Sequence, residues 1–389
     1  MVVRKLATLK EMYVNRLLDI REQLKGKSHF LLGPRQTGKS FLIKHTLRDC
    51  KMYDLLDSEV YLNLSQNPKR IEQELPPDKT TVIIDEIQRL PSLLNEVHRL
   101  IENRDVTFLL TGSSARKLRG GGVNLLGGRA RSKYLHPFVY RELGSRFNLM
   151  KALNIGTLPG IYFSDSPVED LRSYAGDYLQ YEIASEGLTR NVPAFSRFLE
   201  VAALSNASLI NYANISNDAQ VASTTVQEYF QILKDTLIAF ELPAFKKTAK
   251  RKPLSTSKYY FFDVGVVRHL QHRGPLHERA PEIGEAFETY FAHEIKAYVD
   301  YIRDGNLHYW RSKSGFEVDF ILNNQIAIEA KAKRTIFPSD LKGLKALREE
   351  GVLMEYYVVC FEKNRRVMDG ITIINWRDFL SILWEGNIV

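Results

Sequence analysis

Residues 29–40 read HFLLGPRQTGKS and place an apolar run directly before Gly33, four further residues, Gly38, Lys39 and Ser40. Glycines allow the backbone angles that turn successive N–H groups inward around a phosphate, and a lysine followed by a hydroxyl can reach the phosphates and a Mg²⁺ ion. The apolar residues on both sides predict a buried strand before the loop and a helix after it. We therefore predict a P-loop for ATP and Mg²⁺, with nucleotide-binding residues Gly33, Pro34, Arg35, Gln36, Thr37, Gly38, Lys39 and Ser40.

A second apolar run, Thr80–Glu86, ends in two carboxylates. This pattern is typical of a buried parallel strand whose end lies beside the phosphates. We expect Asp85 to share the Mg²⁺ ion with Ser40. Glu86 is the predicted catalytic residue that orients or deprotonates the attacking water.

Two further catalytic candidates follow in the chain. The predicted strand Val106–Leu110 is followed by small hydroxyl residues, and Ser113 is the predicted sensor of the γ-phosphate, with Ser114 as its alternative. The alternative is that this hydroxyl caps the following helix, which is compatible with a sensor role. A glycine-bracketed loop ends in Arg129 and Arg131, and we predict that one of these two arginines, with Arg129 as the first candidate, is an arginine finger that acts in its own subunit or in a neighbouring one. The alternative for Arg129 is a solvated surface arginine.

Composition narrows the class of protein. The 389 residues are 44% hydrophobic, which suits a globular protein of two or three domains, and the formal net charge is +8. A basic balance favours an anionic partner such as DNA, while a solvated basic surface is the alternative. Cys50 and Cys360 lie far apart, so the sequence predicts neither a disulfide framework nor a zinc site, and it predicts a cytoplasmic location. No apolar run approaches about 18 residues, so we expect no membrane segment.

Five stretches carry a family resemblance: GPRQTGKS at 33–40, VIIDE at 82–86, LLTGSS at 109–114, LLGGR at 125–129 and YLHPFVYREL at 134–143. Together they resemble the prokaryotic AAA-type ATPases that carry a C-terminal domain of unknown function. The resemblance implies an ATPase core, a winged helix and a nuclease-like C-terminal module. Where that family often has Arg-Asp-Ile after a Tyr-Leu pair, this chain has Gln180–Ile183, so no arginine role is expected there.

Helical spacing predicts a first helix over Tyr13–Leu24 and three helices within Ala194–Lys234. The last two of these three, Ser208–Ala213 and Ser223–Lys234, would be separated by the polar segment Asn214–Gln220, which suits a helix-turn-helix.

A strand-like segment, Leu237–Phe245, leads into a basic stretch, Lys246–Lys258, and back through Tyr259–Phe262. This pattern resembles a winged helix with a basic wing. DNA binding and protein docking are both open for it.

The resulting fold class is α/β. We predict a P-loop parallel-sheet ATPase domain with a helical lid at residues 1–190, a winged-helix domain at 191–270 and a restriction-endonuclease-like α/β domain at 280–389. An arginine finger supplied by a neighbour would make the protein a homo-oligomer.

The C-terminal module carries a candidate metal-dependent nuclease site formed by Asp319, Glu329 and Lys331 on two adjacent predicted strands, with Glu288 on the preceding helix. The register of the hairpin decides whether this site exists. A two-residue loop would put Asp319 and Glu329 on opposite faces. A three-residue loop, Asn323–Gln325, pairs Asp319 with Glu329 and Glu317 with Lys331, and we predict this odd-length loop. The alternative is a solvent-facing Glu–Lys pair.

The sequence thus predicts an ATP-binding and ATP-hydrolysing AAA-type protein that acts on or near DNA and carries a metal-dependent nuclease module. The alternative is a non-nucleolytic ATP-dependent switch that gates a protein partner.

Overall fold

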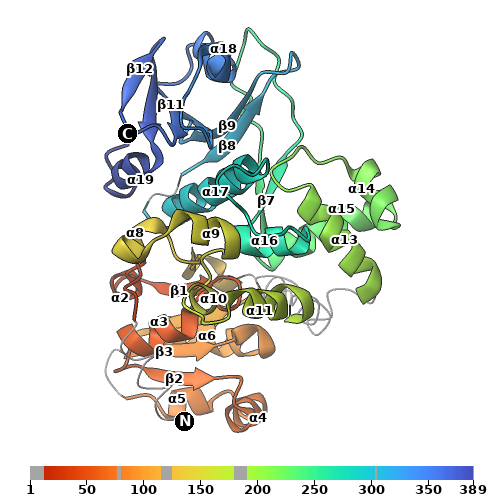
Figure 1. Ribbon diagram of the computed structural model, residues 1–389. Coiled ribbons are helices and arrows are strands. Elements are labelled where there is room, and N and C mark those ends of the chain that lie inside the picture. Colours follow the sequence, from red (N-terminus) through yellow and green to blue (C-terminus); the bar gives the residue numbers. More distant parts are fainter. Residues whose placement is uncertain (1–12, 77–79, 115–124, 179–190, 303–304, 389) are drawn as a thin grey trace.

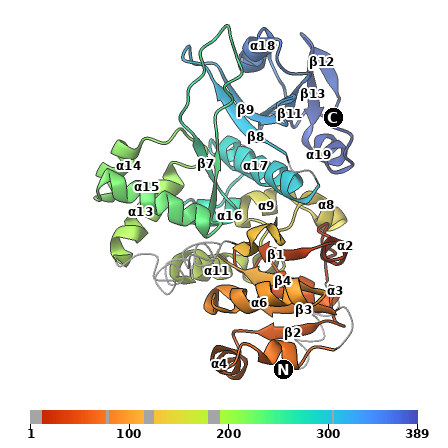
Figure 2. The same cartoon turned by 180° about the vertical axis from the view of Figure 1, so that it is seen from behind.

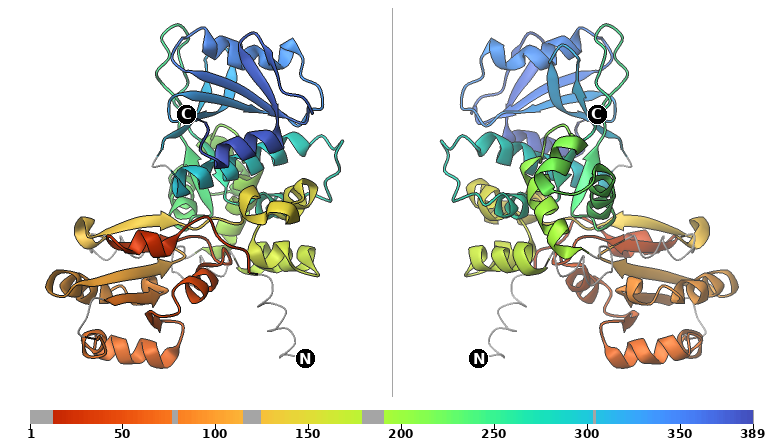
Figure 3. Two further views of the ribbon diagram at one scale, coloured as in Figure 1. Left: turned by 90° about the vertical axis from the view of Figure 1, so that its left-hand side faces the viewer. Right: turned by 90° about the vertical axis from the view of Figure 1, so that its right-hand side faces the viewer.

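The computed structural model describes residues 13–76, 80–114, 125–178, 191–302 and 305–388. A parallel sheet forms the N-terminal end of the molecule, helices and a small hairpin form the middle, and a second sheet forms the C-terminal end (Figure 1). The two sheets lie at opposite ends of the molecule in the side views as well (Figure 3). Within the described residues, no helix is both long and apolar enough to cross a membrane.

The N-terminal sheet has five strands in the order β2-β3-β4-β1-β5, and all neighbouring strands are parallel. Its strands are β1 (Ser28–Leu32), β2 (Lys51–Asp54), β3 (Thr80–Asp85), β4 (Val106–Gly112) and β5 (Ala130–Tyr134). The three predicted strands are β1, β3 and β4, and they form the buried centre of the sheet, as their continuous apolar runs indicate. The edge strands β2 and β5 were not predicted, because they are half exposed and carry polar side chains.

Helices lie on both sides of this sheet: α2 (Ile20–Leu24), α3 (Lys39–Thr46), α4 (Ser58–Gln66), α5 (Arg70–Gln73), the short helix η1 (Ile87–Arg89) and α6 (Leu93–Asn103). The predicted helix over Tyr13–Leu24 is wrong, because only its last five residues are helical. The backbone N–H of Leu17 donates to Glu142 instead of to a helical carbonyl, and Asp19 caps α2.

The short helix η2 (Leu125–Gly128) directly precedes β5. The segment after β5 forms the helices α8 (Tyr140–Leu143), η3 (Gly144–Arg146), α9 (Leu149–Ile155), α10 (Pro159–Tyr162), α11 (Pro167–Arg172) and η4 (Ser173–Tyr178). Several of these helices contribute to the cores of the other two parts of the molecule. Leu153 and Tyr162 belong to the core of the C-terminal part, whereas Ile161 and Tyr174 belong to the core of the middle part. The segment therefore joins the three parts of the molecule.

The middle part contains α13 (Val192–Leu204), α14 (Tyr212–Ala219), α15 (Ser223–Asp235), the antiparallel hairpin β6 (Ala239–Leu242) and β7 (Lys258–Phe261), and α16 (Val264–Leu270). Three helices followed by a hairpin is the predicted order of elements. The predicted second helix was placed too early, because Asn211 caps α14 and most of the segment expected to be a turn is helical.

The C-terminal sheet has the order β12-β13-β11-β10-β9-β8. Its strands are β8 (Leu307–Arg311), β9 (Glu317–Leu322), β10 (Ile326–Ala330), β11 (Glu355–Cys360), β12 (Arg366–Met368) and β13 (Ile371–Asn375), and its helices are α17 (Ile283–Tyr301), η5 (Pro338–Leu341), α18 (Lys342–Arg348) and α19 (Trp376–Trp384). Four of these strands were predicted from the apolar runs Val318–Leu322, Ile326–Ala330, Met354–Cys360 and Ile371–Ile374, and α17 from the amphipathic pattern of Pro281–Tyr298. The strands β8 and β12 were not predicted.

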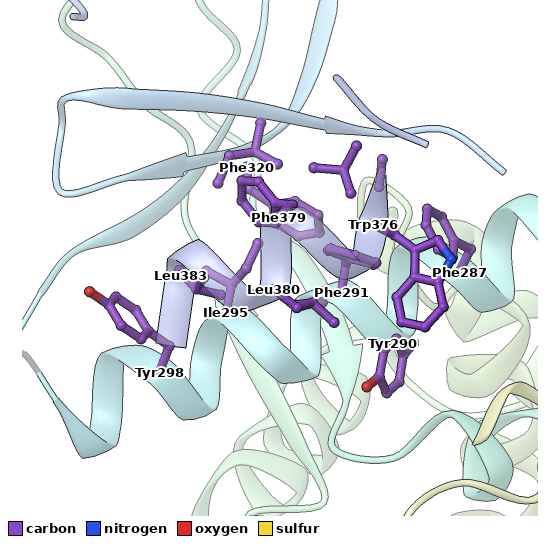
Figure 4. Packing of buried hydrophobic residues seen from close by; sticks show 14 of the residues in the cluster. Phe287, Tyr290, Phe291, Ile295, Tyr298, Phe320, Trp376, Phe379, Leu380 and Leu383 are labelled. Carbon is purple, nitrogen blue, oxygen red and sulfur yellow. The ribbon is translucent and has the colours of Figure 1, made fainter. Parts of the chain in front are cut away.

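Aromatic side chains of α17 and α19 fill the space under one face of this sheet (Figure 4). Phe287 and Phe291 of α17 meet, Phe291 lies beside Phe379 of α19, and Phe320 of β9 lies in the same cluster. This packing fixes α17 against the sheet along most of its length. Glu288, on the same helix, is therefore held in place by its neighbours.

The long connection between β6 and β7 runs beside the C-terminal sheet (Figure 2). Phe245 N donates to Tyr309 O at 2.7 Å, and Leu254 N donates to Arg311 O at 2.8 Å. Both acceptors lie on β8. The connection between β6 and β7, predicted as a basic wing, is thus hydrogen bonded to the edge of the C-terminal sheet.

Candidate functional site

The predicted P-loop connects β1 to α3. Gly38 has φ of +94° and Gln36 has φ of +62°, so the loop uses left-handed backbone at two positions. Lys39 is buried, and its Nζ donates to Gly33 O at 2.7 Å and to Pro34 O at 3.1 Å. A Cβ on Gly33 would lie 2.4 Å from Leu135 O, which explains the glycine there. The lysine ammonium is therefore folded over its own loop, at the position where a P-loop lysine meets phosphate.

Ser40 and Asp85 meet across the sheet edge. Ser40 Oγ donates to Asp85 Oδ2 at 2.9 Å, and Thr111 Oγ1 donates to the other carboxylate oxygen. Asp85 is 2% exposed. A serine hydroxyl next to a buried carboxylate is an oxygen donor set that suits Mg²⁺, so these residues fit the predicted ion. Thr111 is a contributor that the sequence analysis did not single out, although it stands in the quoted LLTGSS stretch.

Glu86 lies one residue beyond Asp85 with φ of +60°, an uncommon backbone angle for a residue other than glycine. Its N–H donates to Thr111 Oγ1 at 3.1 Å, and its carboxylate accepts a hydrogen bond from Gln88 Nε2. Gln88 Nε2 also lies 3.3 Å from Ser113 Oγ. The predicted water-activating residue and the predicted sensor are thus joined through Gln88, which no sequence motif marks.

Two residues outside the motif brace the P-loop. Arg16 donates to Thr37 O at 2.7 Å, to His136 O at 2.6 Å and to Glu142 Oε1 at 2.9 Å. Burial lowers the pKa of Arg16, and the charge of Glu142 outweighs burial, so the net pKa is raised. Tyr174 OH donates to Arg35 O at 3.2 Å. Neither residue stands in a sequence pattern that marks a phosphate site.

Arg129 lies at the start of β5, where its Nε donates to Glu102 Oε1 at 2.5 Å. β1 and β5 are parallel, and Arg129 lies beside the start of β1, whereas the P-loop follows the end of β1. The length of the five-residue strand β1, roughly 16 Å, therefore separates Arg129 from the P-loop. The placement is incompatible with a finger in the chain's own site. A finger offered to a neighbouring subunit stays a prediction. The loop before it, residues 115–124, and Gln180–Ile183 lie outside the described residues.

A cavity of about 340 Å³ lies beside the P-loop. Its lining comes from three parts of the chain: Gly33 and Pro34 of the P-loop, Lys234 and Phe262 of the middle part, and Lys296 of α17. Here His136 Nε2 lies 2.7 Å from Asp300 Oδ2. The P-loop therefore lies close to both following parts of the chain.

The hairpin prediction is confirmed in its loop length. Leu322 pairs with Ile326 and Phe320 with Ile328, which leaves the three-residue loop Asn323–Gln325. Asn323 and Asn324 have φ of +54° and +57°. The ladder stops before Asp319, whose Oδ2 accepts a hydrogen bond from Ala330 N at 2.9 Å.

The four predicted nuclease residues form one electrostatic cluster, in which Asp319 and Glu329 are buried and Glu288 and Lys331 are partly exposed. Lys331 Nζ lies 2.6 Å from Glu329 Oε1. Burial, and then the charge of Asp319, raise the pKa of Glu329 to about 8 and that of Glu288 to about 7. Burial also raises the pKa of Asp319. Carboxylates this close and this buried favour a shared cation or a shared proton.

Two further residues of this cluster come from the middle part. Lys258 Nζ lies 2.5 Å from Glu317 Oε1 and 3.6 Å from Glu288 Oε1, and Tyr260 OH donates to Glu288 Oε1 at 2.6 Å. The predicted register pair of Glu317 and Lys331 lies beyond the ladder, whose last pair is Phe320 with Ile328. The Glu317 carboxylate contacts Lys258 and Arg311. Lys258 was assigned to the basic wing from the sequence, since nothing in a linear pattern relates it to Glu317.

Within the described residues, no group of three or more His, Cys, Asp or Glu side chains is arranged to hold a metal ion. Asp319 and Glu329 offer two carboxylates, and Oε2 of Glu329 is buried without a hydrogen-bond partner. That buried oxygen is the feature that fits a cation.

The predicted basic wing is bound to the C-terminal part. Glu350 accepts hydrogen bonds from the backbone N–H groups of Ala249, Lys250 and Arg251 at 2.8–3.0 Å. The Arg251 side chain also contacts Glu349. The Arg251 side chain of the predicted wing is therefore paired with a carboxylate of the same molecule.

Three family models match consecutive parts of the chain. The AAA domain family matches residues 25–144. A domain of unknown function (DUF8612) matches residues 146–277, and another domain of unknown function (DUF4143) matches residues 283–379. The AAA match contains the P-loop, Asp85 and Glu86.

Two curated relatives are similar over most of the chain. An uncharacterized protein of Mycobacterium tuberculosis (strain ATCC 25618 / H37Rv) is 27% identical over 333 residues, which are 81% of this chain and 72% of the relative. An uncharacterized protein of Mycobacterium bovis has the same identity and coverage.

Among solved structures, the Aeropyrum pernix ORC1 protein in complex with DNA is 15% identical and matches 64% of this chain and 87% of its own, with a TM-score of 0.25. The Pif1 helicase from Candida albicans is 16% identical and matches 42% of this chain and 48% of its own, also with a TM-score of 0.25. These scores are too low to support a shared overall fold. The AAA family match and the P-loop geometry support an AAA-type ATPase domain in the N-terminal part of this chain.

Proposed function

We propose that this protein binds and hydrolyses ATP at its P-loop and uses that cycle on or near DNA. The observation that carries the proposal is the hydrogen bond between Ser40 Oγ and Asp85 Oδ2, with the Lys39 ammonium folded over the same loop. A buried lysine, a hydroxyl and a carboxylate at the end of parallel strands are the groups that phosphoryl transfer requires.

Each residue has a distinct part in the proposed reaction. Backbone N–H groups of residues 36–40 hold the phosphates, and Lys39 exchanges its contacts with Gly33 and Pro34 for the β- and γ-phosphates. Mg²⁺, when bound by Ser40 and Asp85, neutralises phosphate charge. Glu86 accepts a proton from the attacking water, and the products are ADP and inorganic phosphate.

Gln88 holds the Glu86 carboxylate before nucleotide enters, and it also lies beside Ser113. A phosphate that bonds to Ser113 would compete for the Gln88 amide and release Glu86 toward the water. We propose that Ser113 reports the γ-phosphate to Glu86 by this exchange.

The test is ATP hydrolysis by the full chain with Mg²⁺, measured as phosphate release alone and with duplex or single-stranded DNA. Turnover that depends on Lys39 and rises with DNA supports the proposal. Turnover without any DNA effect would favour the alternative, a switch that gates a protein partner. Absence of ATP binding would refute both.

A second candidate function is metal-dependent DNA cleavage at the C-terminal cluster. It is supported by the three-residue hairpin loop, which brings Asp319 near Glu329 and Lys331, and by the unpartnered buried oxygen of Glu329. In this proposal Asp319 and Glu329 hold the metal ion, with Glu288 nearby, and Lys331 orients the attacking water. The ion would lower the pKa of that water.

Cleavage of supercoiled DNA in Mg²⁺ or Mn²⁺ tests this candidate. Weak nicking that disappears in Asp319→Asn and persists in Glu278→Gln, an exposed carboxylate on the same part of the chain, would support it. Equal nicking by the wild type and Asp319→Asn would point to a contaminating nuclease and refute the proposed site.

A further inference from the structure

The tip of the connection between β6 and β7 lies beside α18 and presents a row of backbone donors to it (Figure 2). The N–H groups of Ala249, Lys250 and Arg251 donate to one carboxylate at 2.9, 2.8 and 3.0 Å. That carboxylate belongs to Glu350, just beyond the end of α18. Successive backbone N–H groups that converge on one point form a nest, an arrangement that binds anions in proteins. Residues 249–251 therefore form a nest that holds an anion of the same chain.

The nest has hydrogen bonds of its own that fix its shape. Thr248 Oγ1 donates to Arg251 O at 2.9 Å and closes the turn. Trp310 Nε1, on β8, donates to Thr248 Oγ1 at 3.3 Å. On the other side of the turn, Lys313 N donates to Lys252 O at 3.0 Å. None of these bonds involves the bound carboxylate, so the turn does not depend on that carboxylate for its shape.

Glu350 carries its charge into the nest. Its side chain is 0% exposed, and Arg251 Nη1 lies 3.4 Å from its Oε1. Burial raises the pKa of Glu350, but the hydrogen bonds from the three N–H groups outweigh burial, and the net pKa is lowered. The nest thus holds a full negative charge. A phosphate of the DNA backbone carries the same single charge.

Lysine side chains surround the nest. Lys246, Lys247 and Lys252 are exposed and form no ion pair with any residue that the structure describes. Lys250 Nζ donates to a backbone oxygen, Glu349 O, at 2.5 Å. Four lysines therefore lie within the seven residues 246–252. Such a cluster gains affinity for DNA by releasing counterions from its phosphates, so the surroundings of the nest suit a chain of phosphates.

We propose that the nest at residues 249–251 binds a phosphate of the DNA backbone, and that Glu350 occupies the nest until DNA displaces it. A phosphate offers the same charge and acceptor oxygens, and the lysines attract the neighbouring phosphates as well. Glu350 is tethered beside the nest, so it competes at a high effective concentration and lowers the affinity for DNA. This assignment rests on the proposed action on DNA, and it adds where DNA is contacted and what limits the contact.

The experiment measures binding of fluorescently labelled duplex DNA to the nucleotide-free full chain by fluorescence anisotropy at one fixed salt concentration. Glu350→Gln and Glu350→Ala remove the competing charge, and both should bind DNA at least about fivefold more tightly than the wild type. Glu278→Gln is the matched control, because it makes the same change in net charge at an exposed carboxylate. Its affinity should stay within about twofold of the wild type.

A second substitution assigns the gained affinity to the nest. Ala249→Pro removes one nest N–H without changing the charge, and adding it to Glu350→Ala should abolish most of the gain. If the proline variant does not fold, Thr248→Val serves the same purpose, because it removes the hydroxyl that closes the turn. Thermal unfolding is followed for every variant. A gain that survives the loss of the nest would overturn the assignment.

Three further outcomes would overturn the proposal. The first is that both Glu350 variants fold and bind DNA no more tightly than Glu278→Gln, which would make the contact purely structural. The second is that neither Glu350 variant folds, which would mean that DNA cannot displace the carboxylate. The third is a gain for labelled polyglutamate without a gain for DNA, which would assign the nest to an acidic protein partner.

ATP hydrolysis by the wild type, measured with and without DNA, separates this proposal from the proposed function. Tighter DNA binding by both Glu350 variants, together with wild-type hydrolysis that does not respond to DNA, would support the nest and refute a DNA-dependent ATPase cycle. DNA-stimulated hydrolysis by the wild type with unchanged DNA affinity in both Glu350 variants would do the reverse.

Discussion

Ser40 Oγ donates a 2.9 Å hydrogen bond to Asp85 Oδ2, which joins the first turn of α3 to the end of β3. The two residues stand 45 positions apart in the sequence. Their contact fixes the P-loop against the carboxylates that follow the central strand. Nucleotide binding, assigned to the P-loop, and hydrolysis, assigned to Glu86 after Asp85, can therefore be tested with separate substitutions.

We predict different losses for Lys39→Ala and Glu86→Gln. Lys39→Ala removes the buried ammonium and should lower ATP affinity by about 100-fold or more. Glu86→Gln keeps the shape of the side chain and should leave the Kd within about threefold, while kcat falls by about 10²–10⁴-fold. Fluorescent-nucleotide binding and phosphate release measure the two effects.

Lys44→Ala is the matched control, because Lys44 lies exposed on the same helix as Lys39. It should bind and hydrolyse ATP like the wild type. Loss of ATP binding in Glu86→Gln would contradict the separate roles.

A second prediction concerns Arg129, which lies at the sheet edge opposite the P-loop and contacts Glu102. If it serves a neighbouring subunit, Arg129→Ala and Lys39→Ala should each lose most ATPase activity, and a mixture of the two should recover part of it. Mixed interfaces would combine an intact P-loop with an intact arginine. Phosphate release across a series of mixing ratios measures this.

Arg131→Ala, an exposed arginine on the same strand, is the control and should keep full activity. Absence of recovery in mixtures that still assemble, as followed by size-exclusion chromatography with light scattering, would refute a finger in the neighbouring subunit.

The sequence predicted what local patterns determine. β1, β3 and β4 were predicted because buried parallel strands are continuous apolar runs, and the hairpin register followed from the loop length. β5 was missed because its residues ARSKY alternate charge with small side chains at a half-exposed edge. The first helix was wrong because Arg16 and Leu17 contact Glu142, more than a hundred residues away.

In the candidate sites, too, residues that stand in local motifs were predicted, and residues brought in by tertiary contacts were not. Lys39, Ser40 and Asp85 stand in motifs whose spacing encodes their positions. Lys258 approaches Glu317 only because the connection between β6 and β7 is bonded to β8. Tertiary contacts of this kind have no periodicity in the sequence, so a single chain does not predict them.

A third prediction concerns the approach of α18 to β9. A Cβ on Gly343 would lie 1.8 Å from Glu317 O, a backbone atom that cannot turn away. Gly343→Ala should therefore lower the stability of the C-terminal part by about 2 kcal/mol or more. Thermal unfolding and limited proteolysis measure the loss.

Gly284→Ala is the matched control, because a Cβ at this position in α17 meets nothing within 4 Å. Replacing a helical glycine by alanine there should be neutral or stabilising by up to about 1 kcal/mol. Equal stability of the two variants would contradict the close packing of α18 on Glu317.

The last prediction concerns the pH dependence of stability that the carboxylate cluster imposes. Burial and the charge of Asp319 raise the pKa of Glu329 to about 8, whereas an unfolded glutamate titrates near about 4.3. Between these values the folded chain keeps a proton that the unfolded chain has released. Stability contributed by the neutral carboxyl is thus complete below about pH 4.3 and is lost as pH rises toward about 8.

Glu329→Gln should remove this loss, because glutamine stays neutral and its oxygen can still accept a hydrogen bond from Lys331. The melting temperature of the wild type should fall relative to that of Glu329→Gln by about 3 °C or more between pH 5 and pH 8.5, measured at constant ionic strength without divalent ions. Glu278→Gln, at an exposed carboxylate, should run parallel to the wild type. A constant difference between wild type and Glu329→Gln across this range would mean that Glu329 is ionised throughout, with Lys331 and Lys258 together balancing the charges of the cluster.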